Sequence, residues 1–180
     1  MATEIQSAKI VVEEIENAAG GNPYSVTLAT ESTTTGGVAV DFTSIPSGTT
    51  QIALMCTIST NGTSDVIFQL GRGSTVYETS GYAGNVSNQA ASFEALSDGF
   101  DMKLTMIAAR NYTFFGKLYL EDSSNNTWYC KGSCVSPGNA DEHDVVLGTK
   151  SLSAPLTAVR LTTSNGSDTF DAMAYNIQFT

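Results

Sequence analysis

The sequence predicts an all-β protein, an antiparallel β-sandwich of the jelly-roll type preceded by a short N-terminal helix or arm. Three observations lead to this prediction. From residue 24 onward, short runs of residues are apolar at every second position. Turn sequences that contain glycine, asparagine or proline separate these runs, at intervals of about 8 to 12 residues. No helical pattern lies between successive runs, which excludes parallel folds whose strands are joined by crossover helices.

Residues 1–22 form the one segment with a helical period, and we treat them as a docking segment separate from the β-domain at 23–180. Thr3 and Gln6 fit a capping box, and Gly20 and Gly21 would end the helix. One face of this helix would carry Ile5, Ala8, Val12, Ile15 and Ala19. Two heptads are too short for a stable free helix, so we expect this face to bind a partner. An extended arm is the alternative, because residues 10–12 are β-prone.

Within the β-domain, alternating runs predict ten strands. They are expected at 26–30, 38–42, 51–58, 66–70, 101–108, 113–120, 127–131, 145–152, 159–163 and 169–179. Turns are expected at 47–48, 61–62, 71–73, 123–126, 137–138 and 165–166. The polar segments 73–93 and 133–144 are expected to be long display loops. The similar motifs at 60–65 and 164–168 are both expected to be hairpin turns with positive φ.

The charge balance excludes several function classes. The net charge is −10, and the chain has only 8 Lys and Arg residues. No basic stripe could neutralise a phosphate backbone, so we expect no nucleic-acid binding, and no docking on an anionic membrane. No apolar run approaches the roughly 20 residues of a membrane span, and the N-terminus has no secretory signal pattern. We therefore expect no membrane insertion, and folding in a cytosol.

The three cysteines are expected to be free. Cys56 lies in an apolar strand-like run and is predicted to be buried. If Cys130 and Cys134 lie in one extended strand, they are about 13 Å apart, too far for a disulfide.

The sequence offers little for catalysis or for a metal ion. His143 is the only histidine, and it lies in an acidic stretch that we interpret as a solvated loop. Asp141, Glu142 and Asp144 are weak candidates, with His143, for a metal site, but their spacing fits no calcium loop. A zinc site of Cys130, Cys134 and His143 would lack a fourth ligand. We expect no metal and no cofactor.

Paired carboxylates are the remaining candidates for catalysis. Asp98 with Asp101, Glu121 with Asp122, and Asp168 with Asp171 could each supply the two acids of a glycosidase. All of them lie at predicted strand ends or turns, where acidic residues are common. The sequence therefore predicts a protein without enzymatic activity and without catalytic residues.

Aromatic residues gather between positions 112 and 129. Alternation predicts that Phe114 and Trp128 face one side of their sheet while Phe115 and Tyr129 face the other. One set is expected to fill the core, and the other could stack on sugar rings or pack against a partner. Tyr112, Trp128 and Tyr129 are accordingly candidate partner-binding residues, together with the apolar face of the N-terminal segment.

Two parts of the sequence carry a resemblance to a known family. Residues 40–48 (VDFTSIPSG), 59–71 (STNGTSDVIFQLG) and 78–84 (ETSGYAG) form the first part. Residues 159–171 (VRLTTSNGSDTFD), with Leu152 before them and Asn176 after them, form the second part. These stretches resemble a β-sandwich domain of tail-fibre and other virion proteins of tailed bacteriophages. The resemblance covers about half of the chain.

The resemblance implies a structural protein of the virion, assembled in the bacterial host cytoplasm and often trimeric. Its partners would be other virion proteins, sister copies and, as a further candidate, a host surface glycan. A tail-fibre or tail-appendage component is the first interpretation. A capsid decoration protein (cement protein or head fibre) and a carbohydrate-binding module for host surface glycans are the two alternatives. The family supplies no catalytic residue to this chain.

Overall fold

The computed structural model describes residues 27–28, 32–34, 36–73, 76–88, 92–103, 106–136 and 143–180. These residues form strands, turns and loops, and the described part of the chain contains no helix. The predicted N-terminal segment 1–22 lies outside these ranges, together with its candidate residues Ile5, Ala8, Val12 and Ile15.

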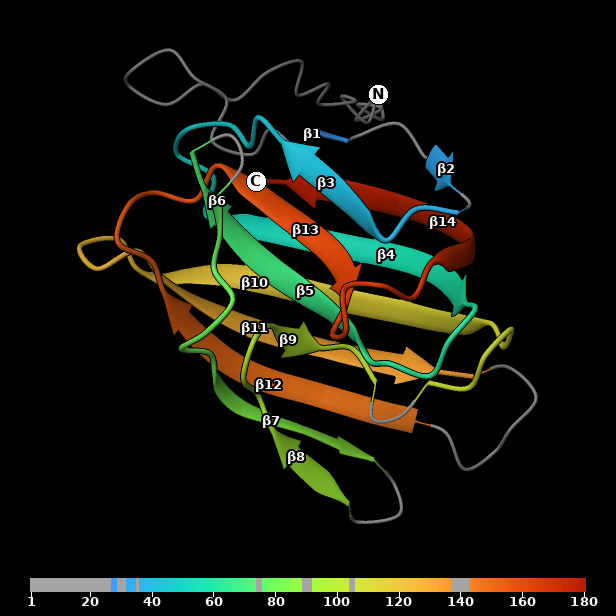
Figure 1. Cartoon of the computed structure of the whole chain (residues 1–180). Helices are drawn as coiled ribbons and strands as arrows, with labels where there is room; N and C mark the ends of the chain where they lie inside the picture. The colour runs from blue at the N-terminus through green and yellow to red at the C-terminus, as the bar shows by residue number, and fades with distance from the viewer. Residues whose placement is uncertain are drawn as a thin grey trace, which may run out of the picture.

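Two antiparallel sheets pack face to face, which confirms the predicted β-sandwich (Figure 1). The strands are β1 (Thr27–Leu28), β2 (Ser32–Thr34), β3 (Ala39–Thr43), β4 (Gln51–Thr60), β5 (Val66–Arg72), β6 (Val76–Tyr77), β7 (Ala83–Asn88), β8 (Phe93–Ala95), β9 (Phe100–Asp101), β10 (Tyr112–Asp122), β11 (Thr127–Val135), β12 (His143–Ser151), β13 (Ala158–Thr163) and β14 (Phe170–Phe179). The larger sheet has nine strands, in the order β1-β14-β4-β10-β11-β12-β7-β8, with β2 also paired to β14. The smaller sheet has the order β3-β13-β5-β6, with β9 paired to β5.

Alternation of apolar side chains explains the long strands of the nine-stranded sheet. Along β10, β11 and β12, every second residue is buried and the residues between them are exposed or half-buried. Leu54, Phe114, Leu118 and Val146 point inward in this way and are at most 3% exposed. They meet Phe68, Leu70, Val159 and Leu161 of the smaller sheet in one core. Such a dry layer between two sheets is the main stabilising feature of a sandwich.

Strand β5 is buried on both of its faces over Val66–Leu70, and β9 (Phe100–Asp101) pairs with it. We predicted a strand over 101–108, and this prediction was wrong: pairing ends at Asp101. Met102 and Met106 are nevertheless 1% exposed. The apolar pattern at these positions reflects a loop packed into the core rather than a strand.

The predicted loop 73–93 was also wrong, because it contains β6, β7 and the start of β8. Strand β7 pairs with β12 from Asn88↔Asp144 to Ala83↔Thr149. Only Val86 of its side chains is fully buried, so the apolar signal of this edge region is weak. The predicted loop 133–144 is strand at both of its ends, since β11 continues to Val135 and β12 starts at His143.

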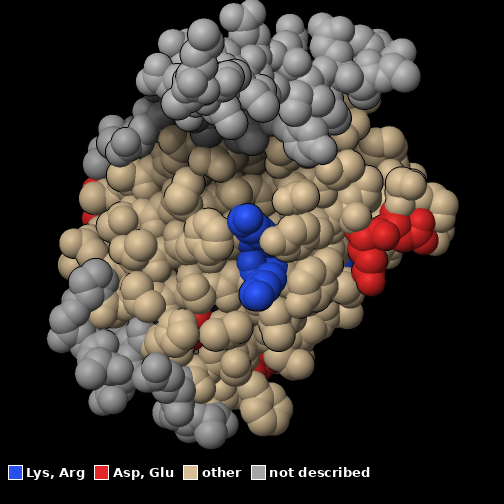
Figure 2. All heavy atoms as spheres, turned by 180° about the vertical axis from the view of Figure 1, so that it is seen from behind, with Lys and Arg blue, Asp and Glu red and all other residues tan. Residues whose placement is uncertain are grey.

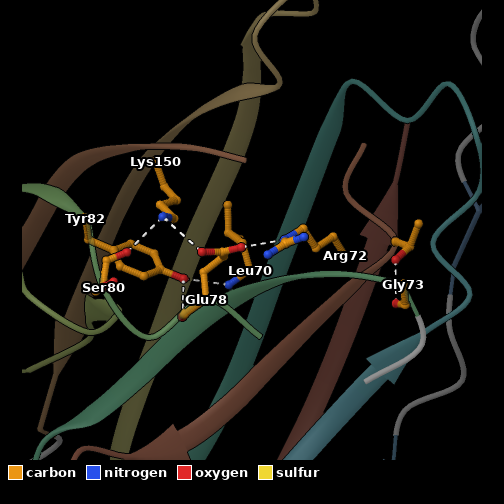
Figure 3. Close-up of polar contacts among 8 residues, drawn as sticks. Leu70, Arg72, Gly73, Glu78, Ser80, Tyr82 and Lys150 are labelled. Carbon is orange, nitrogen blue, oxygen red and sulfur yellow. Dashed lines mark hydrogen bonds and ion pairs between the residues drawn. The ribbon is translucent and has the colours of Figure 1, made fainter. Parts of the chain in front are cut away.

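The segment between β6 and β7 joins the two sheets through a polar network (Figure 3). Glu78 accepts a hydrogen bond from Arg72 at 2.7 Å and lies 3.4 Å from the Lys150 ammonium. Lys150, on the nine-stranded sheet, also donates to the Ser80 carbonyl at 2.8 Å. The Tyr82 hydroxyl accepts from the Leu70 amide at 2.8 Å and donates to the Glu78 carbonyl at 3.1 Å. The Arg72 hydrogen bond is the main reason why the pKa of Glu78 is lowered.

A buried ion pair makes a second link between the sheets. Lys103, just after β9, donates to Asp144 of β12 at 3.0 Å, and the two side chains are 6% and 0% exposed. The Lys103 ammonium also lies 5.5 Å from the centre of the Tyr112 ring. Because both charges are removed from water, each depends on the other for its stability.

The two similar Asn-Gly motifs interlock at one corner of the sandwich. The Asp168 carboxylate accepts a hydrogen bond from the Ser64 amide at 3.1 Å, and the Asn61 side chain accepts from the Thr169 amide at 2.8 Å. Both motifs connect strands that belong to different sheets, so the prediction that they are hairpin turns was wrong. Positive φ occurs at Gly166 (65°), as predicted, but not at Gly62. Gly62 instead leaves room for the Asp168 carboxylate, which a Cβ would overlap.

Candidate functional site

The candidate site lies on the face of the nine-stranded sheet that points away from the core, which we call the outer face. Strands β4, β10, β11 and β12 form its centre, and their outward side chains include the apolar residues Met55, Phe115, Val135 and Leu147. These four apolar side chains are 37–45% exposed. Figure 2 shows this side of the molecule with one group of basic side chains near its centre, and with acidic side chains mainly toward its edges.

A hollow lies in the middle of the outer face. Its volume is about 450 Å³. It is lined by Phe115, Lys117, Tyr119, Lys131, Gly132, Ser133, His143 and Val145, and we call it the lysine groove. The strand register explains its shape: Phe115 pairs with Ser133, and Ser133 pairs with Val145. The small Ser133 side chain between two larger ones leaves the sheet surface open at this point.

Two lysines occupy the groove side by side. Lys117 of β10 and Lys131 of β11 are direct partners in the antiparallel ladder, so their side chains leave the sheet next to each other. Neither of them makes an ion pair or a hydrogen bond with any residue in the described ranges. The other lysines of the described chain, Lys103 and Lys150, both contact carboxylates. Like charges directly opposite each other in a sheet are unfavourable.

The aromatic side chains divide as alternation predicted. Phe114 and Trp128 are 3% exposed and face the core, whereas Phe115 is 44% exposed on the outer face. Tyr129 is half-buried, and its ring is on the same side as Phe115. Of the three aromatic candidates for partner binding, Tyr112 and Trp128 therefore lie in the core, and Tyr129 alone reaches the surface. Tyr112 instead accepts a hydrogen bond from the Ile107 amide at 3.1 Å.

His143 is the first residue of β12 and lines the lysine groove, so its predicted place in a solvated loop was wrong. Asp144 follows it and points to the opposite side of the sheet, where it meets Lys103. The two side chains therefore cannot hold the same ion. Asp141 and Glu142 lie outside the described residues.

The cysteines face the core as well. Cys56, Cys130 and Cys134 are free, as predicted, and all three are at most 4% exposed, which was predicted for Cys56. Burial raises the pKa of the Cys56 and Cys130 thiols well above the ordinary value. Cys130 and Cys134 lie on the face of β11 opposite to the lysine groove, and so they cannot share a zinc ion with His143. Within the described ranges, no three His, Cys, Asp or Glu side chains gather as metal ligands.

Several of the candidate carboxylates have structural partners. Asp122 accepts hydrogen bonds from the amide and hydroxyl of Ser124 and from the Asn125 side chain, and these contacts lower its pKa. Asp168 is held by Asn165 and Ser64, which likewise lower its pKa. These two acids hold turns in place.

Asp101 is different, because it is 8% exposed on the smaller sheet. Burial, reinforced by the negative charges of Asp65, Asp98 and Glu94, raises the pKa of Asp101 to about 7. The structure thus brings the predicted pair Asp98 and Asp101 into one acidic cluster.

A second, smaller cavity of about 180 Å³ opens at one end of the sandwich. Trp128, Pro46, Pro155 and Leu156 line it, and the Trp128 indole N–H has no acceptor among the described residues.

Lys117 and Lys131 were not identified from the sequence. The turn expected at 123–126 pairs residue 122 with residue 127, and a regular hairpin from there would place residue 117 opposite residue 132. The register shift between Leu120 and Asp122 brings Lys117 opposite Lys131 instead, and no pattern in the sequence indicates that shift.

Among the described residues, no helix has the length and apolar character that a bilayer crossing requires. Comparisons with protein-family models, with curated proteins and with solved structures found no match to this chain.

Proposed function

We propose that this chain is a non-enzymatic structural and binding protein of a tailed-phage particle, a component of the tail fibre or of another tail appendage. The observation that carries the proposal is the outer face of the nine-stranded sheet. It is broad, carries most of its acidic side chains toward the edges, and exposes Met55, Phe115, Val135 and Leu147 by 37–45%. Exposed apolar patches of this kind typically mark interaction sites.

The rigidity of this face supports a binding role. Its central strands β10, β11 and β12 are each hydrogen-bonded on both sides, and their inward side chains are locked in the core. Side chains on such a scaffold lose little conformational freedom when a partner binds. The resemblance of residues 40–84 and 159–171 to virion proteins of tailed phages favours an appendage as the place where this face is used.

The proposal includes the absence of enzymatic activity, and the placement of several candidate groups supports it. His143 is separated from Asp144 by the sheet itself, and the Asp122 and Asp168 carboxylates are engaged in turns. Hydrolysis of a glycosidic bond needs two carboxyl groups across a substrate cleft, and the lysine groove is lined by cations instead.

Labelling of intact particles tests the proposal. Antibodies raised against the chain, coupled to gold and viewed by electron microscopy, should mark the tails of the phage particles that carry this protein. Labelling of the heads would favour the capsid decoration alternative. Purified particles that contain no copy of the chain by mass spectrometry would contradict both.

We further propose that the chain assembles as a homotrimer with the help of residues 1–22. Light scattering of the full chain should give three times the monomer mass of 18.9 kDa. Deletion of residues 1–21 should change the oligomeric state or the incorporation into particles. If neither changes, the N-terminal segment has no docking role.

A carbohydrate-binding module is the second candidate function, and the lysine groove favours it. An exposed aromatic ring beside polar side chains is the usual composition of a small-molecule site, and Phe115, Tyr119 and Ser133 provide these elements here.

A further inference from the structure

We infer that the lysine groove binds an acidic saccharide, a sugar unit that carries a carboxylate. This inference deepens the proposed function and rests on it, because it names the ligand of the binding face. Three properties of the groove support it: its charge, the chemistry of its walls, and its better fit to a sugar than to a peptide.

The charge of the groove calls for an anion. Lys117 and Lys131 stand next to each other without a carboxylate partner in the described part of the chain, although acidic residues outnumber basic ones by 18 to 8. The pair destabilises the free sheet, since like charges repel across a ladder. A bound carboxylate would lie between two ammonium groups, and charge-assisted hydrogen bonds are the strong ones.

The walls of the groove suit a sugar ring. Phe115 exposes 44% of its surface at one side of the groove, and an aromatic face packs well against the C–H face of a sugar. Tyr119, Ser133 and His143 add side-chain groups that can donate or accept hydrogen bonds with hydroxyl groups. The volume of about 450 Å³ lies within the range of small-ligand sites.

A peptide fits this place less well than a saccharide. Strand addition requires a free sheet edge, but β10, β11 and β12 are paired on both sides. An extended acidic peptide across the groove would therefore find no backbone partners for its own amide and carbonyl groups. A saccharide has no such backbone, and its hydroxyl groups match side chains.

Isothermal titration calorimetry of the full chain with trigalacturonic acid tests the inference. The neutral methyl ester of the same trisaccharide is the matched control ligand. We expect the acid to bind, the ester to bind at least tenfold more weakly, and the affinity for the acid to fall between 50 mM and 500 mM NaCl because salt screens exposed charges. Lys117→Gln and Lys131→Gln should each weaken binding about tenfold, and Lys131→Arg should restore most of the affinity.

Arg160→Gln is the control protein, since it removes one positive charge from β13 of the smaller sheet, where Arg160 pairs with Asp41 and not with the groove. It should bind the acid like the unchanged chain. Lys117→Gln and Lys131→Gln should unfold at or slightly above the temperature of the unchanged chain, because each removes the repulsion between the two lysines. This measurement separates loss of a ligand contact from loss of the fold.

Three results would overturn the inference. They are absence of binding to trigalacturonic acid, equal affinity for its methyl ester, and tighter binding of hexaglutamate than of the acid, which would identify an acidic protein segment as the occupant. None of these results bears on whether the chain is part of a phage particle, so particle labelling judges the proposed function separately.

Discussion

The protonation of Asp101 should make the stability of the fold depend on pH in an unusual direction. Its carboxyl is 8% exposed, and burial together with Asp65, Asp98 and Glu94 raises its pKa from 3.8 to about 7. The side chain is therefore neutral in the folded protein under conditions in which it is ionised in the unfolded chain. Replacement by asparagine, which is neutral at every pH and has a similar shape, isolates this effect.

The sign follows from proton counting. Between about pH 4 and pH 7 the folded protein holds a proton on Asp101 that the unfolded chain has released, so the folded state binds more protons. The contribution of Asp101 to the free energy of unfolding is fully present below pH 3.8 and is lost as the pH rises to about 7. A shift of about three pKa units corresponds to a loss on the order of 4 kcal/mol.

Urea unfolding at several pH values measures this loss, and the single tryptophan, Trp128, provides the signal because it is buried. Asp101→Asn should gain up to about 4 kcal/mol relative to the unchanged chain between pH 4 and pH 8. Asp171→Asn, at an exposed position of β14, removes the same charge and serves as the control. An equal pH dependence for the unchanged chain and Asp101→Asn would refute the assignment.

Three further perturbations test other parts of the fold. Lys103→Met leaves the Asp144 carboxylate buried without its lysine, and urea unfolding should show a loss of about 3–5 kcal/mol that Lys103→Met/Asp144→Leu largely recovers; a loss below about 1 kcal/mol would contradict the burial of this pair. Gly84→Ala should destabilise by more than about 3 kcal/mol, because φ is 142° and a Cβ would overlap the Leu147 carbonyl; an unchanged melting temperature would show that β7 lies elsewhere. The three buried thiols should resist Ellman's reagent in the native protein and react after denaturation; rapid native reaction would contradict the described core.

The sequence predicted those elements whose side chains alternate strictly. The strands around Leu54, Phe114 and Val146 have one face toward solvent and one toward the core. Apolar residues at every second position of the sequence indicate that arrangement directly. The same alternation correctly assigned neighbouring aromatic residues, such as Phe114 and Phe115, to opposite faces of the sheet. Turns with a positive φ at Gly48 and Gly166 were also predictable, because glycine is the residue that this conformation favours.

Other elements depend on tertiary contacts that a local pattern does not contain. Strand β7 buries only Val86 fully, and its backbone pairs with β12. Because the pairing partner is distant in the sequence, the sequence of β7 itself resembles that of a polar loop. Met102 and Met106 are 1% exposed in the core although they lie outside any strand, and their spacing in the sequence resembles that of a strand.

The candidate site also combines a feature that alternation predicts with features that depend on contacts between strands. The outward position of Phe115 was predictable from alternation, but the groove arises from the register that places Ser133 between Phe115 and Val145. The lysine pair likewise requires two residues from different strands to meet. Pairwise register, rather than residue type, was the missing information.

The central claim is that the outer face is open in the free chain and carries two lysines without a carboxylate partner among the described residues. Acetylation of the native full-length chain by an N-hydroxysuccinimide ester, read by mass spectrometry, tests this claim directly. Lys117 and Lys131 should be modified rapidly, whereas Lys103 and Lys150, which are buried and in contact with carboxylates, should react only after unfolding. Slow modification of Lys117 and Lys131 at the rate of Lys103 would mean that this face is covered, and would contradict the claim.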